Sequence, residues 1–595
     1  MTATATDTYL LLRAFCDELA RCGVTDACTS PGSRSTPMVL SLAREPGLRS
    51  WSHVDERVAG FFAVGLAKRT GRPVAVTVTS GTAAAELAPA VIEAAEARVP
   101  LIVLTTDRPP ELRDVGAGQT IDQVKLFGGA AKQFVEVGVV GAATVERLRW
   151  IRTLACRAVW TAQSGRPGVV HLNFPLREPL VLDGPLPEDP LPGRADGRPW
   201  VASVTAGATD EVPPLRARHA LDAGEAAVGA LARARRAVVV AGRSERGPLV
   251  GVAVAALAEE AGWPLLADPL SGARAGASAI AHYDALLRDE AFVAGLGAPE
   301  LVIRVGDVPT SKPLRGWLAG LDPAIPQVAL DPEATWHDPD GVVSERVGGE
   351  LRQLLATLAL THAGSGDAAW LARWRAADGA AARAIEATIG AGAEAPLNEP
   401  LVARELAAAL PPAATLFVAA SMPIRDVETF APAAADASAA ARVLSNRGAN
   451  GIDGTVASAL GAAAAGGGPV ALLIGDVALA YDLSALLSAR RLGLDLAIVL
   501  VNNDGGGIFH FLPVATQADH FEHHVATPHG LDFALGARLY GARHVPVATA
   551  GELRAAVAEA TRPGAGVTIV EARSERDENV ALHRRVWQAV GAALR

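Results

Sequence analysis

Short runs of β-branched and aliphatic residues recur along the chain and alternate with alanine-rich stretches of helical character. The runs are almost continuously apolar, which is typical of strands covered on both faces of a parallel sheet. Sheets of this kind bind ligands at the carboxyl ends of their strands. The pattern therefore predicts an α/β protein with strands at residues 74–78, 101–104, 169–172, 238–240, 301–305, 416–418, 470–474, 497–501 and 567–570.

Two changes in composition divide this pattern into three parts. Six prolines lie in residues 179–199, a composition that favours a linker over a helix or strand. A small polar stretch at residues 361–367 precedes a long alanine-rich helix that contains Trp370 and Trp374. At 595 residues the chain is also longer than one hydrophobic core supports. We predict three consecutive domains, each with a mainly parallel sheet covered by helices on both faces, at residues 1–180, 200–362 and 368–595.

Net charge indicates which partners to expect, and cysteine content indicates the cellular compartment. The net charge of −10 argues against nucleic-acid binding and leaves small molecules and copies of the same chain as the expected partners. The N-terminus lacks the pattern of a secretion signal, and the four cysteines form no CxxC pair, so we expect buried thiols in a protein of the reducing cytoplasm.

Residues 454–475 are uncharged and long enough to span a membrane, but they contain six glycines and Pro469. We therefore predict a buried helix and strand there rather than a membrane span.

Polar residues follow two of the predicted strands. Asp476 comes directly after the strand at 470–474 and its Gly475, and Asn503 comes 27 residues later, after the strand at 497–501. Both would then lie at the same edge of one parallel sheet. A hard divalent cation binds oxygen ligands, which a carboxylate of Asp476, an amide oxygen of Asn503 and a carbonyl of Gly505 would supply. Alternatively, these residues only form turns at strand ends.

This spacing resembles the motif with which thiamine-diphosphate enzymes bind a metal and the cofactor's diphosphate. Such enzymes carry a glutamate in another domain that hydrogen-bonds the aminopyrimidine ring. The string HVDER at 53–57, followed by an apolar run at 59–67, resembles the surroundings of that glutamate and makes Glu56 the catalytic candidate. A carboxyl backed by apolar surface shares a proton with the ring. Alternatively, Glu56 only complements a helix dipole.

Further strings cover the first and last parts of the chain. They are SPGSRSTP at 30–37, DRPPEL at 107–112, SMPIRD at 421–426, NRGANGIDG at 446–454 and TPHG at 527–530. Together they are similar to the 2-succinyl-5-enolpyruvyl-6-hydroxy-3-cyclohexene-1-carboxylate synthase (MenD) family of menaquinone biosynthesis. The resemblance implies a cytoplasmic homodimer or homotetramer that uses thiamine diphosphate with Mg²⁺ or Mn²⁺. It implies decarboxylation of 2-oxoglutarate and addition of the remaining succinyl-semialdehyde equivalent to isochorismate.

The resemblance also implies roles for individual residues. Both substrates are dicarboxylates, which suit the planar fork of arginine. By family position, isochorismate would contact Ser33, Arg34, Arg108, Gln119 and Lys312. The part derived from 2-oxoglutarate would contact Ser421, Arg425 and Arg447. The cofactor would contact Glu56, Ser80, Ile452, Gly475, Asp476, Asn503, Ile508 and Phe509, with Phe509 and Leu512 also lining the substrate pocket.

Several of these assignments have alternatives. For Arg34 and Arg108 the alternative is a role as strand-end caps or partners of Asp107, and Ile508, Phe509 and Leu512 would ordinarily be core. The histidines at 520, 523, 524 and 529 suggest zinc, although their spacing is not that of a helical zinc motif. Acetolactate synthase or another 2-oxoacid decarboxylase is the rival function, and the set of arginines favours a dicarboxylate enzyme instead. The chain departs from the family pattern at Gly118, Glu86, Ala420 and Pro313. Some members have a second cation at the position of Pro313, so that isochorismate contact is either missing here or supplied by Arg315.

Overall fold

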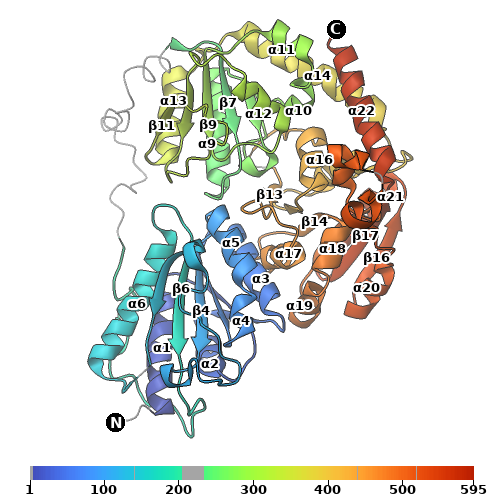
Figure 1. The fold of residues 1–595 in the computed structure, drawn as a ribbon. Coiled ribbons are helices and arrows are strands. Elements are labelled where there is room, and N and C mark those ends of the chain that lie inside the picture. Colours follow the sequence, from blue (N-terminus) through green and yellow to red (C-terminus); the bar gives the residue numbers. More distant parts are fainter. Residues whose placement is uncertain (1–3, 140, 204–232, 438–439, 518) are drawn as a thin grey trace. The chain divides into compact units, whose positions relative to one another are not determined.

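The computed structural model describes residues 4–139, 141–203, 233–437, 440–517 and 519–595 (Figure 1). The described residues form three sheets, of six, five and six strands, in which every strand pair is parallel. The predicted fold class is therefore confirmed. By its contacts the chain divides into two compact units, Met1–Ala208 with Asn446–Gly466 and Tyr481–Leu494, and Thr209–Ser445 with Gly467–Ala480 and Asp495–Arg595.

The first unit contains the first sheet, whose strand order is β2-β1-β3-β4-β6-β5. Its strands are β1 (Asp26–Thr29), β2 (Arg49–Ser52), β3 (Val74–Val78), β4 (Leu101–Asp107), β5 (Ala131–Glu136) and β6 (Val169–Pro175). Its helices are α1 (Ala5–Arg21), α2 (Thr36–Arg44), α3 (Glu56–Thr70), α4 (Thr82–Ala85), α5 (Ala88–Ala97), η1 (Pro110–Leu112), η2 (Gly128–Ala130), α6 (Val145–Gln163), α17 (Thr455–Ala464) and α19 (Ala485–Leu492).

The second unit contains two sheets, with strand orders β11-β10-β9-β7-β8 and β13-β12-β14-β15-β17-β16. The first of these, the middle sheet, consists of β7 (Ala237–Ala241), β8 (Leu265–Ala267), β9 (Leu301–Val305), β10 (Gln327–Leu330) and β11 (Glu345–Val347). The other, the third sheet, consists of β12 (Thr415–Val418), β13 (Arg442–Leu444), β14 (Val470–Gly475), β15 (Leu496–Asn502), β16 (Arg543–Val547) and β17 (Val567–Arg573).

Helices connect the strands of the second unit, as parallel pairing requires. In the middle part they are α9 (Pro248–Ala261), η3 (Pro269–Ser271), α10 (Tyr283–Leu286), α11 (Glu290–Leu296), α12 (Lys312–Ala319), α13 (Leu351–His362) and α14 (Ala368–Ile389). Around the third sheet they are α15 (Glu399–Ala409), α16 (Met422–Phe430), α18 (Asp476–Tyr481), η4 (Gly507–Phe511), η5 (Pro513–Thr516), η6 (Glu522–Ala526), α20 (Phe533–Tyr540), α21 (Ala550–Ala560) and α22 (Arg576–Ala593).

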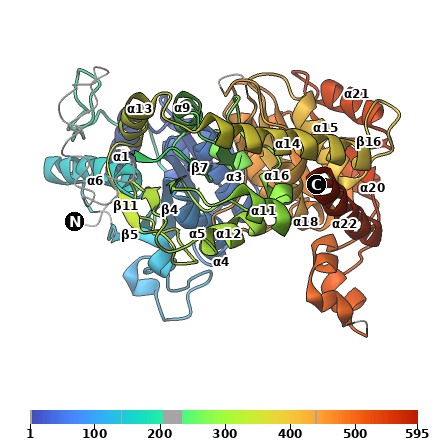
Figure 2. The ribbon, with the colours of Figure 1, turned by 90° about the horizontal axis from the view of Figure 1, so that it is seen from above.

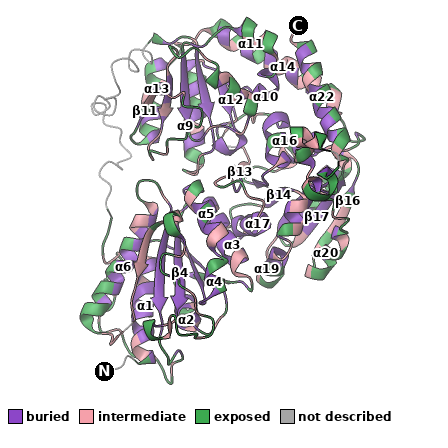
Figure 3. Cartoon of the chain, in the orientation of Figure 1, coloured by how far each residue is buried: buried purple, intermediate pink, exposed green. Residues whose placement is uncertain are grey.

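The middle sheet is covered on both faces. Val239 and Ala241 of β7 belong to one buried cluster, with α9 and α13, whereas Val238 and Val240 belong to another, with Trp374 of α14. Figure 2 shows α9 and α13 on one side of β7 and α11 and α12 on the other, and the strands are buried in Figure 3. Because alternate residues of one strand enter opposite cores, the run is continuously apolar, as predicted.

Each of the nine predicted strands is present, and so is the helix–strand pair expected at 454–475. The strands that were not predicted have three to six residues, and most of them lie at sheet edges, namely β2, β5, β8, β11, β13 and β16. The sequence of β2 is RSWS, with all four residues at least partly exposed. An edge strand that is open to solvent needs no apolar run, which explains why the hydrophobic pattern does not reveal it.

Glycines allow α3 and α17 to pack at close range within the first unit. A Cβ on Gly65 would lie 1.9 Å from the carbonyl oxygen of Ser458, and one on Gly461 would lie 2.1 Å from the carbonyl oxygen of Phe62. Larger residues at either position would push the helices apart. The four cysteines are buried and free, as expected. No helix among the described residues is both long and apolar enough to cross a membrane.

Candidate active site

Glu56 is the first residue of α3, in the connection that follows β2. Asp55 caps this helix, because its carboxylate accepts hydrogen bonds from the backbone N–H groups of Arg57 (2.9 Å) and Val58 (3.2 Å). The cap fixes the backbone from which the Glu56 side chain leaves. Glu56 lines a cleft of about 650 Å³ in the first unit, together with Gly32, Glu86 and Gln119 among others.

The surroundings of Glu56 favour its protonated form. Partial burial raises the pKa of its carboxyl, and the nearby carboxylates of Asp55 and Glu86 raise it further. Glu86 stands where the resembled family commonly has asparagine, so this chain places an additional negative charge in the cleft. A carboxyl with a raised pKa is suited to sharing a proton with a ring nitrogen.

Ser80, Arg108 and Gln119 are joined by hydrogen bonds. Arg108 donates from Nη1 to the Ser80 hydroxyl (2.5 Å) and from Nη2 to the carbonyl of Gly118 (3.0 Å). Ser80 donates to the carbonyl of Gln119, and the Gln119 side chain donates back to the carbonyl of Ser80, each at 3.0 Å. Gln119 adopts a left-handed φ of 57°, a conformation that such reciprocal bonds help to maintain. Three predicted site residues therefore form one network.

Arg34 is buried, and its guanidinium is bound by the segment after β6. It donates to the carbonyl of Leu176 (2.7 Å) and pairs with Glu178 (3.4 Å), while Nε has no hydrogen-bond partner. Burial and the nearby Arg108 lower its pKa. Asp107 pairs with Arg113 instead (2.7 Å), so the suggested pairing with Arg34 is not seen. Arg34 thus caps the end of a strand, while Ser33 beside it is exposed.

Residues 446–454 form a loop of the first unit that contains two further candidates. The backbone N–H groups of Gly448 (3.0 Å) and Ala449 (2.7 Å) donate to the carboxylate of Glu93, which pairs with Lys68 at 3.4 Å. Both ion-pair side chains are almost fully buried. This buried pair anchors the loop that carries Arg447 and Ile452, both of them half-buried.

Asp476 lies at the carboxyl end of β14 and is buried. Its Oδ1 accepts from the backbone N–H of Val477 (2.7 Å), and its Oδ2 accepts from those of Asn503 and Gly505, both at 3.0 Å. Gly505 has a φ of 141°, and a Cβ there would lie 2.4 Å from the carbonyl oxygen of Ala526. Only glycine fits this turn, which brings the loop after β15 onto the carboxylate.

Asn503 presents an unpaired oxygen at the same strand edge. Its Nδ2 donates to Glu399 at 2.9 Å, but its Oδ1 is buried without a hydrogen-bond partner. Burial also raises the pKa of Asp476. A buried acceptor without a donor is costly, and a cation bound there would satisfy Oδ1 and stabilise the Asp476 carboxylate. The residues present therefore fit a hard divalent metal, with the Gly505 carbonyl as a third oxygen.

The remaining predicted residues belong to the second unit. Ser421 precedes α16 with a φ of 73°, and Arg425 donates to its carbonyl. Ile508 and Phe509 lie in η4 and Leu512 follows it, with Phe509 36% and Leu512 46% exposed, so these two are not core residues within the chain. Lys312 begins α12 and is exposed, whereas Arg315 pairs with Asp340 at 3.4 Å.

Three residues lie near the metal candidates although the sequence analysis assigned them no role beside Asp476 and Asn503. His529 Nε2 lies 3.3 Å from Asp476 Oδ2, and Asp504 accepts from the backbone N–H groups of His529 (3.0 Å) and Gly530 (2.7 Å). Glu399 binds the amide of Asn503. The string TPHG at 527–530 was the available signal for His529. The described residues contain no group of three or more His, Cys, Asp or Glu side chains suited to a metal.

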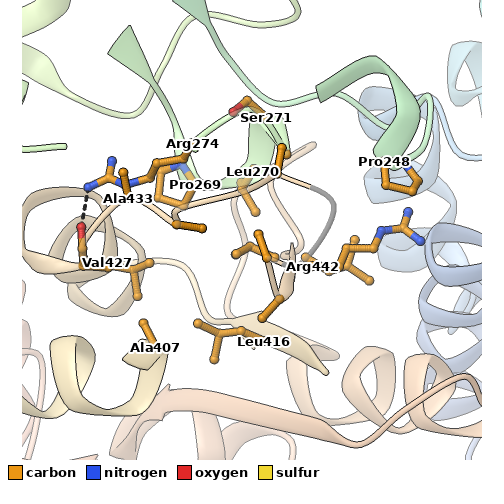
Figure 4. A pocket seen from close by; sticks show the side chains of 18 of the residues that line it. Pro248, Pro269, Leu270, Ser271, Arg274, Ala407, Leu416, Val427, Ala433 and Arg442 are labelled. Atoms are coloured by element: carbon orange, nitrogen blue, oxygen red, sulfur yellow. Dashed lines mark hydrogen bonds between the residues drawn. The ribbon is translucent and has the colours of Figure 1, made fainter. Parts of the chain in front are cut away.

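A second cavity of about 280 Å³ lies in the second unit (Figure 4). It is lined mainly by apolar residues such as Leu270, Leu416 and Val427. Arg274 at its edge donates to four backbone carbonyls, of Ala267, Ala281, Glu428 and Ala431. None of the predicted site residues lines this cavity.

Three models of protein families match successive parts of the chain. Residues 11–126 match the model of the thiamine pyrophosphate enzyme N-terminal TPP binding domain, residues 199–418 that of the middle domain of thiamine pyrophosphate, and residues 430–572 that of the thiamine pyrophosphate enzyme C-terminal TPP binding domain.

Similar full-length proteins are also known. The chain is 42% identical to a 2-succinyl-5-enolpyruvyl-6-hydroxy-3-cyclohexene-1-carboxylate synthase of Chloroflexus aurantiacus, over 98% of this chain and 96% of the relative. Proteins with the same name from Geobacillus thermodenitrificans and Myxococcus xanthus are each 43% identical. Those matches cover 98% of this chain and 96% of the Geobacillus protein, and 100% of this chain and 99% of the Myxococcus protein.

Proposed function

The chain belongs to the 2-succinyl-5-enolpyruvyl-6-hydroxy-3-cyclohexene-1-carboxylate synthase family of thiamine-diphosphate-dependent transferases, and from this we propose how its residues divide the reaction. It is an enzyme of menaquinone biosynthesis that forms the carbon–carbon bond of the family's product. The proposed substrates are 2-oxoglutarate, which loses carbon dioxide, and isochorismate, which accepts the remaining succinyl-semialdehyde equivalent.

Glu56 is proposed as the catalytic acid–base group. Thiamine diphosphate, when bound, supplies a nucleophilic carbon and an electron sink for decarboxylation. Glu56 would hold a proton at the aminopyrimidine ring, and its half-buried carboxyl with a raised pKa supports this role. The further contacts proposed for the cofactor come from Ser80, Ile452, Gly475, Ile508 and Phe509.

Asp476, Asn503 and the carbonyl of Gly505 are proposed to hold a divalent metal, Mg²⁺ or Mn²⁺. One observation carries this proposal: the buried Oδ1 of Asn503 has no partner, while its backbone N–H donates to the buried carboxylate of Asp476. A cation bound to these oxygens would attract a diphosphate. Residues 503–505, which begin the loop after β15, would therefore help to orient the cofactor.

Fixed cations and amides are proposed to bind the two dicarboxylates. Isochorismate would contact Ser33, Arg34, Arg108, Gln119 and Lys312, and the hydrogen bonds among Ser80, Arg108 and Gln119 support a preformed site for it. The part derived from 2-oxoglutarate would contact Ser421, Arg425, Arg447, Phe509 and Leu512. The positive φ of Ser421 is the kind of local strain that clusters at active sites.

The assembly proposed is a homodimer or homotetramer in the cytoplasm, with domains at residues 1–180, 200–362 and 368–595. In the thiamine-diphosphate enzymes that this chain resembles, the glutamate and the metal that act on one cofactor come from two chains. A two-fold assembly of this chain would contain two such sites. The division of the candidate residues between two units of the chain is compatible with this arrangement.

An assay with purified protein, thiamine diphosphate and Mg²⁺ tests the proposed reaction against the acetolactate alternative. We expect isochorismate to disappear only when 2-oxoglutarate is also present, and pyruvate not to replace 2-oxoglutarate. If 2-oxoglutarate loses carbon dioxide while isochorismate persists, the acceptor is wrong. If pyruvate supports the reaction equally well, the donor is wrong.

A further inference from the structure

Glu399 is a buried carboxylate that none of the proposed catalytic steps uses. It is 3% exposed and is the first residue of α15. Asn398 caps this helix by accepting from the backbone N–H of Leu401 at 3.0 Å, and Pro400 follows in the first turn. Cap and proline together fix the backbone around Glu399. The carboxylate is therefore held in one place relative to the third sheet.

One oxygen of Glu399 accepts two hydrogen bonds. Its Oε1 accepts from Asn503 Nδ2 at 2.9 Å and from the Ser574 hydroxyl at 2.8 Å. Ser574 directly follows β17, and its backbone N–H donates to the carbonyl of Asn502 at 3.0 Å. The Glu399 side chain is thus attached to the ends of two neighbouring strands, β15 and β17.

An amide side chain has one donor end and one acceptor end, whereas an ionised carboxylate only accepts. Oε1 of Glu399 is the acceptor in both of its hydrogen bonds, so it binds Asn503 through Nδ2. A flipped amide would place its oxygen against a carboxylate oxygen and lose the hydrogen bond. The orientation that Glu399 selects is the one in which Oδ1 of Asn503 points away from Glu399 and has no protein partner.

We propose that Glu399 is a positioning residue that orients the Asn503 amide so that Oδ1 is available to the metal. This inference rests on the metal role proposed above for Asp476 and Asn503. The charge of the cluster agrees with it, since Glu399 and Asp476 are both buried carboxylates and a divalent cation offsets their repulsion. Residues that orient metal ligands in this way typically change metal affinity about 10- to 100-fold when replaced.

Binding of Mn²⁺ in the presence of thiamine diphosphate, followed by electron paramagnetic resonance, tests the inference without measuring turnover. We expect Glu399→Met to weaken Mn²⁺ binding about 10- to 100-fold, because the Met thioether is a far weaker acceptor for Nδ2 than a carboxylate. Glu399→Gln retains an acceptor oxygen and should bind Mn²⁺ within a few-fold of the wild-type chain. Equal affinity of Glu399→Met and wild type would overturn the positioning role.

Glu405 provides a matched control on the same helix. It is also buried, but it pairs with Arg404 (3.2 Å) and Arg554 rather than with Asn503. Glu405→Met should therefore lower the unfolding temperature and leave Mn²⁺ affinity unchanged. If Glu405→Met weakens Mn²⁺ binding as much as Glu399→Met does, the effect is a general loss of stability and the inference fails.

Exchange of donor and acceptor gives a second test, which holds even if Glu399→Met does not fold. In Asn503→Asp, two carboxylates would face each other, and adding Glu399→Gln would restore one hydrogen bond. We expect Glu399→Gln to strengthen Mn²⁺ binding in the Asn503→Asp background only. The same effect in both backgrounds would overturn the inference. No cofactor-dependent Mn²⁺ binding by the wild-type chain would instead overturn the proposed metal site.

Discussion

The first and third sheets have the same strand order, but different chemistry stands at their equivalent strand ends. When the strands of each sheet are numbered from one to six in sequence order, both sheets have the order 2-1-3-4-6-5. Ser80 follows β3 closely and Arg108 directly follows β4, while Asp476 and Asn503 directly follow the counterparts β14 and β15. The backbone plan therefore provides positions, and the side chains decide what each position does.

The two sets also differ in how they are held. Asp476 is buried and accepts three backbone hydrogen bonds, which is an arrangement for binding a cation tightly. Glu56 is half-buried in an open cleft, and burial together with the nearby carboxylates raises its pKa, which is an arrangement for proton exchange. The Asp476 region is suited to binding a cation and the Glu56 region to exchanging a proton. Variants of Asp476 should therefore lose affinity, and variants of Glu56 should lose turnover.

The largest expected effect is on turnover in Glu56→Gln. The amide keeps the shape of the side chain but cannot exchange the proton, so kcat should fall about 10²- to 10⁴-fold while cofactor affinity changes little. Steady-state kinetics and calorimetry measure the two quantities. Glu146→Gln is the control, because Glu146 is also an acid in the first turn of a helix, α6, but is exposed. Equal losses in both variants would favour the helix-dipole role for Glu56.

In Asp476→Asn we expect cofactor affinity, rather than turnover of the bound complex, to be the main loss. Loss of the charge should weaken Mg²⁺-dependent binding of thiamine diphosphate about 100-fold, the equivalent of about 2.7 kcal/mol. Calorimetric titration with and without Mg²⁺ measures this. Asp495→Asn is the control, since Asp495 also accepts two backbone N–H bonds, both at 2.7 Å, beside the other end of β15. Unchanged affinity in Asp476→Asn would remove Asp476 from the metal site.

Low pH should lower the stability of the protein through His53, which lies three residues before Glu56. Burial, with the charge of Arg491, lowers the pKa of His53 to about 3, and its Nδ1 lies 3.0 Å from the Ser488 hydroxyl. In the unfolded chain the pKa of His53 is about 6.5, so the unfolded chain binds the proton more tightly than the folded chain does. The stability that neutral His53 contributes is therefore complete above pH 6.5 and is lost as the pH falls toward 3.

The loss should reach about 2 kcal/mol by pH 5. Denaturant unfolding of wild type and His53→Gln at pH 7 and pH 5 measures it. The variant should lose about that much less stability on acidification and should keep wild-type metal affinity at pH 7. A pH dependence that is identical in both proteins would contradict the assignment to His53.

Much of this arrangement could be predicted because it follows from strand ends. β14 and β15 are apolar throughout, so their positions were clear, and Asp476 and Asn503 lie together as their spacing predicts. β2 leaves no such pattern, since it is an exposed edge strand. Glu399 could not be found either, because it contacts Asn503 from 104 residues away and reads in sequence only as the start of a helix.

The proposal that Glu56 and the Asp476–Asn503 pair from different chains act on one cofactor has a direct test. Chains carrying Glu56→Gln and chains carrying Asp476→Asn are co-expressed with different affinity tags, and mixed dimers are isolated by two purification steps. A mixed dimer would contain one site with both halves intact, so we expect about half of the wild-type activity per dimer. Mixed dimers that are no more active than either variant alone would contradict the shared site.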